Sequence, residues 1–197
     1  NTAARQVIRK FPSALLASAL PVVFVLIWST GFIVARYGMP YSPPFRFLLV
    51  RFGLSVLCFL PWIFFLNLRW PGTLAQWGHL AISGVMMHAA YLGGVWAAVK
   101  FGMGTGLASL IVGLQPILTA LWVTATAKDR RHFSGYQWAG LLMGCLGVLL
   151  VVSGKFGHSG PGDQVDWFNL AIAFGALVAI TSGTLYQKRF VAPCDVR

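Results

Sequence analysis

Six long apolar runs follow one another along the chain, and each could cross a lipid bilayer. About 20 consecutive apolar residues span a hydrocarbon core of about 30 Å. Inside lipid, backbone polar groups must bond within the segment, so each run is predicted to be an α-helix. The runs are Ala14–Ala35, Phe45–Leu66, Leu80–Val99, Phe101–Ala127, Phe133–Gly154 and Trp167–Gln187. The predicted fold class is therefore all-α, a polytopic integral membrane helix bundle with about six transmembrane helices in this chain.

The composition agrees with a membrane protein and argues against other classes. Hydrophobic residues make up 57% of the chain and charged residues 10%, and the mean hydropathy is +0.74. The net charge of +11 does not indicate nucleic acid, because no basic face carries interleaved aromatic residues. The three cysteines show no paired spacing. No disulfide framework, metal site or cofactor is predicted.

The acidic residues argue against an enzyme. Membrane enzymes need clustered acids, histidines or nucleophile–base pairs. His88 is the one histidine well inside a predicted span, and all four acids fall in predicted loops. These acids are Asp129, Asp163, Asp166 and Asp195. We therefore predict no enzymatic activity and no catalytic residues. A channel would favour rings of charge or repeated carbonyl motifs, and the sequence shows neither.

The basic residues alternate between the two sides of the predicted membrane. Cytoplasmic loops of membrane proteins carry an excess of Lys and Arg. With the N-terminus inside, ten basic residues lie on the cytoplasmic side, four on the other, and Arg51 within a span. The ten are Arg5, Arg9, Lys10, Arg69, Lys128, Arg130, Arg131, Lys188, Arg189 and Arg197, and the four are Arg36, Arg46, Lys100 and Lys155. The N-terminus is therefore predicted to be cytoplasmic.

The fourth run, Phe101–Ala127, carries an amide and a proline where it should cross the middle of the bilayer. Pro116 removes one backbone hydrogen bond and bends the helix. In hydrocarbon this loss is tolerated only beside other protein or a water-lined cavity. We therefore expect this helix to line a cavity, with Pro116 as a hinge. Gln115, Thr119 and Trp122 lie on its more polar face and are predicted to contact substrate.

The first run contains a polar, flexible patch formed by Trp28, Ser29, Thr30 and Gly31. The two hydroxyl groups can bond to carbonyl groups of their own helix, which is a purely structural role. Alternatively, the patch lines a substrate cavity, with Gly31 as a second hinge. The sequence leaves both interpretations open.

Arg51 lies about 10 Å along the second helix from Pro44, at 1.5 Å per residue. Its long side chain could reach the headgroups, or it could face the interior of the bundle. In the third run, His88 and Tyr91 share a helical face. His88 is either a packing residue or a group that contacts substrate or a coupling proton. Tyr91, Trp96 and Trp122 could stack on apolar or aromatic groups of a solute.

Two segments of the chain resemble each other. Arg36-Tyr37-Gly38-Met39-Pro40 follows the first run, and Arg189-Phe190-Val191-Ala192-Pro193 follows the sixth. Five spans separate the two copies, so the second would cross the membrane in the opposite direction. Inverted repeats of this kind occur in transporters that bind substrate near the bilayer midplane.

Several motifs resemble the EamA-type drug/metabolite transporter (DMT) superfamily. They are LIWSTGFIVARYGMP, the arginine of FRFLLVRF, SLIVGLQPILTALW, and GYQWAGLLMGCLGVLLV followed by TLYQKRF. The resemblance extends from Leu20 to Pro193 and implies a ten-helix transporter with two inverted five-helix repeats around a central cavity. Residues 1–154 would form the first repeat, 155–166 an extramembrane loop, and 167–197 the first helix of a truncated second repeat. This chain is thus expected to be a fragment.

The resemblance implies a function as well as a fold. Its members move small organic solutes such as amino acids, other metabolites or drugs. We expect a secondary transporter that works by alternating access in the bacterial cytoplasmic (inner) membrane, with lipid and a small-molecule substrate as partners. An interior Arg51 would favour an anionic or zwitterionic solute. Where family members often carry Glu-Arg after the fourth span, this chain has Lys128-Asp129-Arg130. A non-transporting structural subunit is the alternative, and a homodimer stays open.

Overall fold

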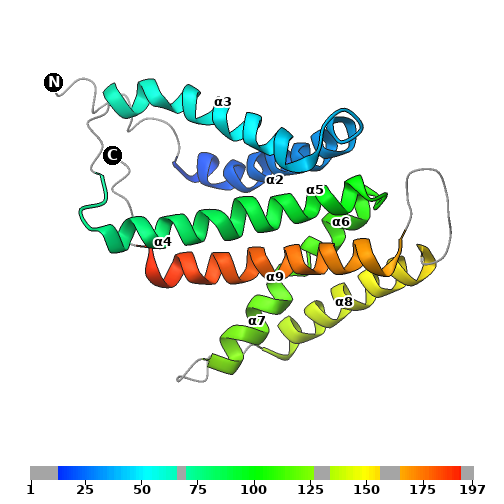
Figure 1. Ribbon diagram of the computed structural model, residues 1–197. Helices are drawn as coiled ribbons and strands as arrows, with labels where there is room; N and C mark the ends of the chain where they lie inside the picture. Colours follow the sequence, from blue (N-terminus) through cyan, green and yellow to red (C-terminus); the bar gives the residue numbers. More distant parts are fainter. Residues whose placement is uncertain (1–12, 66–69, 127–133, 156–164, 192–197) are drawn as a thin grey trace.

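The regular elements of the protein are helices, arranged as six spans (Figure 1). The computed structural model describes residues 13–65, 70–126, 134–155 and 165–191. All six spans are long and apolar enough to cross a membrane, so the prediction of an all-α polytopic bundle is confirmed. The spans are α2 (Ser13–Gly38), α3 (Pro44–Phe65), α4–η2–α5 (Leu74–Gly84, Val85–Leu92 and Gly93–Lys100), α6–α7 (Thr105–Val112 and Gln115–Thr126), α8 (Gly135–Lys155) and α9 (Trp167–Phe190).

Local sequence explains where the helices begin. Asp166 accepts a hydrogen bond from the backbone N–H of Asn169 at 2.8 Å, and the Asn169 side chain accepts one in return from the N–H of Asp166. This reciprocal cap fixes the start of α9. Thr73 caps α4 through the N–H of Gln76. Pro44 begins α3, where its missing N–H would have had no helical partner.

The third span differs from its prediction in length and in winding. It begins at Leu74, six residues before the predicted Leu80, and runs for 27 residues. Its middle part, η2, is a π-helix, a rare form that is frequently found at functional sites in other proteins. The α9 helix passes very close to η2. A Cβ atom added to Gly183 would lie 2.9 Å from Cγ of Met87.

The fourth span was predicted to be a single helix with a bend at Pro116. Instead, Phe101–Gly104 precede the helix, and Gly102 adopts a φ of 98° that favours glycine. The helix then breaks at residues 113 and 114, ahead of the proline. Pro116 lies in the first turn of α7, where its missing N–H is tolerated.

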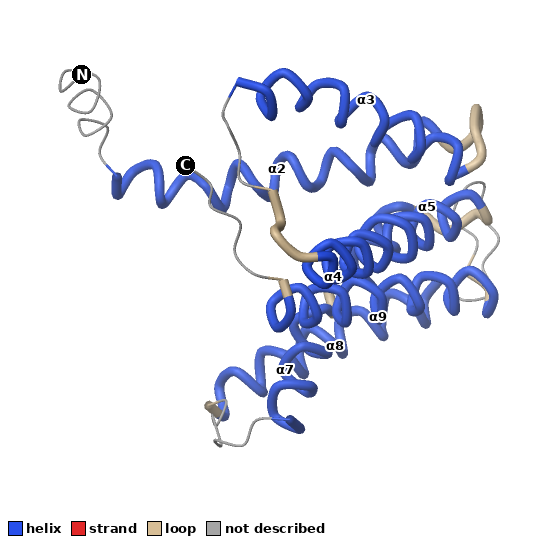
Figure 2. Tube along the Cα trace, turned by 60° about the vertical axis from the view of Figure 1, so that its left-hand side comes forward, coloured by secondary structure: helices blue, strands red, loops and turns tan. Residues whose placement is uncertain are grey.

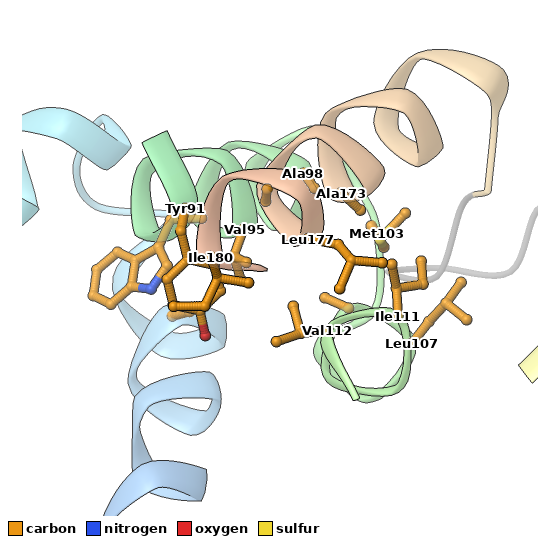
Figure 3. Packing of buried hydrophobic residues seen from close by; sticks show 14 of the residues in the cluster. Tyr91, Val95, Ala98, Met103, Leu107, Ile111, Val112, Ala173, Leu177 and Ile180 are labelled. Carbon is orange, nitrogen blue, oxygen red and sulfur yellow. The ribbon is translucent and has the colours of Figure 1, made fainter. Parts of the chain in front are cut away.

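The core of the molecule forms where α9 runs antiparallel to the third span (Figures 1 and 2). Phe168 contacts Phe101 at one end of this pair, and Tyr186 contacts His79 at the other. The buried residues of both spans and of α6 form one hydrophobic cluster (Figure 3). Those labelled are Tyr91, Val95, Ala98, Met103, Leu107, Ile111, Val112, Ala173, Leu177 and Ile180.

The helices α3 and α8 contribute little to this core. Leu48 is the buried residue of α3, and Val148 is that of α8. Most of their other apolar side chains are exposed, as expected for surfaces that face lipid or further helices. The centre of the structure is therefore the group of the third span, α6–α7 and α9, whereas α2 is as little buried as α3.

Candidate functional site

A cavity of about 250 Å³ lies between α2, α3, the third span and α9, and aromatic side chains form much of its wall. We call it the aromatic cavity. It is lined by Ile27, Trp28, Gly31, Phe32, Arg51, Phe52, Met87, His88, Tyr91, Leu92, Val95, Trp96 and Ile180. Six of the residues predicted as binding or hinge positions are thus brought together by three spans, α2, α3 and the third span.

Arg51 is the one cationic residue of this wall. Its guanidinium carbon lies 5.8 Å from the ring centre of Trp96 and 6.0 Å from that of Phe52. Cations attract aromatic faces at these distances. No ion pair or side-chain hydrogen bond of the guanidinium group occurs among the described residues. Its five N–H donors are therefore available to a carboxylate.

The aromatic walls differ in how firmly they are held. Trp96 is 1% exposed and packs on Phe47, with ring centres 5.0 Å apart. Trp28 is 43% exposed and stacks on Tyr91 at 6.4 Å. Trp96 is therefore part of the core as well as of the cavity, whereas Trp28 has room to rearrange around a solute.

His88 lines the aromatic cavity from the π-helix. Its Nδ1 lies 3.3 Å from the carbonyl oxygen of Gly84, and its ring meets the edge of Phe52 at 5.1 Å. His88 is exposed, while its neighbour Tyr91 is buried. Nδ1 bonds to the helix itself, which leaves Nε2 as the ring atom able to contact a solute.

A larger groove of about 950 Å³ lies beside the break in the fourth span. We call it the broken-helix groove. It shares Trp28, Phe32, Met87 and Ile180 with the aromatic cavity, so the two spaces are adjoining. Its remaining lining residues are Phe24, Val25, Ser29, Ile33, Thr105, Gly106, Ser109, Val112, Gly113, Gln115, Pro116 and Thr184.

Three predicted positions lie outside both spaces. The Thr30 hydroxyl donates to the carbonyl of Ile27 at 2.6 Å, and that of Thr119 donates to Gln115 at 2.9 Å. Both therefore make the structural bond within their own helix. Trp122 lines a separate pocket of about 360 Å³ between α7 and α9. Their assignment to the substrate site stays a prediction.

The structure adds residues that the sequence did not single out. Thr184 of α9 meets Gln115 across the broken-helix groove, 69 positions away in sequence. Phe52 and Ile180 close the aromatic cavity. No signal in the sequence pointed to Thr184, because a hydroxyl in an apolar helix commonly bonds to its own backbone, as Thr184 does to Ile180.

No cluster of three or more His, Cys, Asp or Glu side chains that could bind a metal occurs among the described residues. Cys58 and Cys145 are both free thiols, on α3 and α8. The candidate site is thus a pair of adjoining spaces, one with aromatic walls and a free guanidinium group, the other beside a broken helix.

A membrane bundle of this kind matches a known family. The model of the EamA-like transporter family matches residues 15–153, well over half of the chain. The chain belongs to this family. The resemblance seen in the sequence motifs is therefore confirmed, and the protein is an integral membrane protein of a transporter family.

Several family members resemble the chain along most of its length. It is 28% identical over 174 residues to a protein of Escherichia coli K12 named "Probable amino-acid metabolite efflux pump", covering 88% of this chain and 54% of that protein. A protein of the same name from Salmonella typhimurium is 28% identical over 178 residues, covering 87% and 53%. The "Uncharacterized inner membrane transporter YedA" of Escherichia coli K12 is 23% identical over 168 residues, covering 85% and 52%. The chain spans about half the length of these relatives. No solved structure matches it significantly.

Proposed function

We propose that the protein containing this chain is a secondary transporter for small zwitterionic or anionic organic solutes of the amino-acid type. The observation that carries this proposal is Arg51, an exposed residue whose guanidinium group lines the aromatic cavity and has no ion pair or side-chain hydrogen bond among the described residues. An ionisable group within a membrane span is costly and usually serves a substrate or ion pathway. Among the described residues of the spans no carboxylate lines this cavity, which argues against a purely cationic drug as substrate.

The relatives support the same class of solute. Two of them carry names that refer to amino-acid metabolites. The aromatic walls formed by Trp28, Tyr91 and Trp96 would favour solutes with apolar or aromatic side chains. A solute carboxylate would pair with Arg51 while its side chain lies against these rings.

We propose alternating access as the mechanism. In this scheme one five-helix repeat rocks against an inverted copy around a fixed site near the membrane midplane. Residues 1–154 would form the first repeat and α9 the first helix of the second. The long contact between α9 and the third span supports this, because it would place the boundary between repeats at the cavity. The break between α6 and α7 would act as the hinge.

We further propose that the protein lies in the bacterial inner membrane with its N-terminus in the cytoplasm. The basis is the excess of basic residues in loops on that side, together with the name of one relative. A homodimer is compatible with the exposed apolar faces of α3 and α8 but is not required by them.

Flux through proteoliposomes tests the proposed function. Protein of natural length would be reconstituted and loaded with unlabelled L-phenylalanine, and uptake of labelled L-phenylalanine followed by counterflow. We expect uptake above that of empty liposomes, saturating with concentration. A screen of aromatic, aliphatic and acidic amino acids without any uptake would reject the proposal in favour of a non-transporting subunit.

A further inference from the structure

The break in the fourth span leaves backbone carbonyl groups without backbone donors. In a continuous helix the carbonyl of Val112 would accept from residue 116, but Pro116 has no N–H. Ile117 and Leu118 both donate to Leu114 instead, so Gly113 also receives no backbone bond in the described chain. Gly113 has no side chain and lines the broken-helix groove through its main chain. The break therefore presents oxygen acceptors beside the groove.

The hydroxyl groups around the groove add further acceptors. Ser29 donates its hydrogen to the carbonyl of Leu26 at 2.9 Å, and Ser109 donates to Gly106 at 2.7 Å. Each hydroxyl has one hydrogen and two lone pairs. With the hydrogen bonded to the helix, only lone pairs remain for a molecule in the groove.

Gln115 is held in one orientation by Thr184. The Thr184 hydroxyl donates to the carbonyl of Ile180 at 2.7 Å, so toward Gln115 it can only accept. The amide nitrogen of Gln115 therefore faces Thr184, at 3.3 Å. This assignment leaves the Gln115 amide oxygen as an acceptor with no partner among the described residues.

The groove meets two helix ends of opposite polarity. The C-terminal end of α6 carries partial negative charge and favours a cation, whereas Gln115 and Pro116 begin α7, whose N-terminal end carries partial positive charge. The preference for a cation therefore rests on the acceptor oxygens. Unwound carbonyls and half-helix C-termini bind cations in other transporters. No carboxylate is among the residues that line the groove.

We infer that the broken-helix groove binds a small cation through the oxygen atoms of Gln115, Ser29, Ser109 and the Val112–Gly113 backbone. This inference rests on the proposed function and deepens it. The cation is either the protonated amine of the transported solute or an alkali metal ion such as Na⁺. Thr184 is a positioning residue, since it acts by orienting Gln115.

Calorimetric binding tests this inference independently of transport. Protein of natural length in detergent would be titrated with L-phenylalanine, with phenethylamine, which lacks the carboxylate, and with N-acetyl-L-phenylalanine, which lacks the charged amine. Each titration would be run in Na⁺ and in N-methyl-D-glucamine buffer. The variants are Thr184→Val and, as the matched control, Thr126→Val, whose hydroxyl bonds only to Trp122 of its own helix.

If the solute amine occupies the groove, N-acetylation weakens binding at least tenfold and phenethylamine still binds. Thr184→Val then weakens binding of L-phenylalanine and phenethylamine about 2- to 10-fold, the value of one hydrogen bond, and leaves N-acetyl-L-phenylalanine unchanged. If Na⁺ occupies it, all three ligands bind more weakly without Na⁺, and Thr184→Val lowers the apparent affinity for Na⁺. The inference would be overturned if the affinity were unchanged by N-acetylation of the amine, by removal of Na⁺ and by Thr184→Val. Binding without any flux would instead reject the proposed transport and leave the cation site standing.

Discussion

The hydroxyl oxygen of Tyr186 lies 2.7 Å from Nδ1 of His79, and this contact joins α9 to the beginning of the third span. The two rings are 5.7 Å apart, and Phe190 stacks on His79 from one helical turn further along α9. The contact lies at the end of the bundle that is predicted to face the cytoplasm. It would have to loosen whenever α9 moves away from the third span.

Removing this hydrogen bond alone should weaken the contact measurably. Tyr186→Phe keeps the ring packing and removes the bond, so we expect the free energy of unfolding to fall by about 0.5–1.5 kcal/mol. Thermal unfolding in detergent measures it. Tyr136→Phe is the control, because Tyr136 is 93% exposed and should show no loss. Equal stability of the two variants would show that the contact contributes nothing.

The close passage of α9 past the π-helix should make Gly183 sensitive to any side chain. In Gly183→Ala the new Cβ meets Met87 Cγ at 2.9 Å and Met86 Cβ at 3.1 Å, so these residues must shift. We expect a loss of about 1–3 kcal/mol, typical of overpacking. Gly175→Ala on the same helix meets nothing within 4 Å and should be neutral or stabilising. Equal effects of both changes on thermal unfolding would contradict the proposed packing role.

The two tryptophans of the aromatic cavity should respond differently to truncation. Trp96→Ala removes a side chain that is 1% exposed and should destabilise the protein by about 3–5 kcal/mol. Trp28→Ala should leave stability nearly unchanged but raise the KM for L-phenylalanine about 2- to 10-fold through lost ring contact. Unfolding and flux are measured on the same preparations. A Trp28→Ala protein with unaltered KM would remove Trp28 from the site.

Local pattern was enough to predict the spans and several cavity residues. Long apolar runs leave the backbone no alternative to helix in lipid, so all six spans were found. Arg51 and Gln115 stood out because polar groups are rare within such runs. Arg51 lines the aromatic cavity, and Gln115 lines the broken-helix groove.

Features that depend on contacts between distant segments could not be predicted. The π-helix lies against Gly183, about a hundred positions further along, and nothing within Val85–Leu92 indicates it. The sequence predicted a bend at Pro116, but the helix breaks before it, at residues 113 and 114. The reason is that a proline is tolerated in the first turn of a helix and not in its middle. The His79–Tyr186 bond joins residues 107 positions apart. The third span was predicted to begin at Leu80, so His79 lay just outside it.

The KM of L-phenylalanine flux in Arg51→Gln tests the central claim most directly. Arg46→Gln is the matched control, since Arg46 lies on the same helix but lines neither space. A charge-assisted bond between Arg51 and the solute carboxylate predicts a rise in KM of about 10- to 100-fold for Arg51→Gln and none for Arg46→Gln. Binding of phenethylamine, which lacks the carboxylate, should not weaken in Arg51→Gln. An unchanged KM for L-phenylalanine in Arg51→Gln would contradict the claim and show that this arginine serves the membrane interface instead.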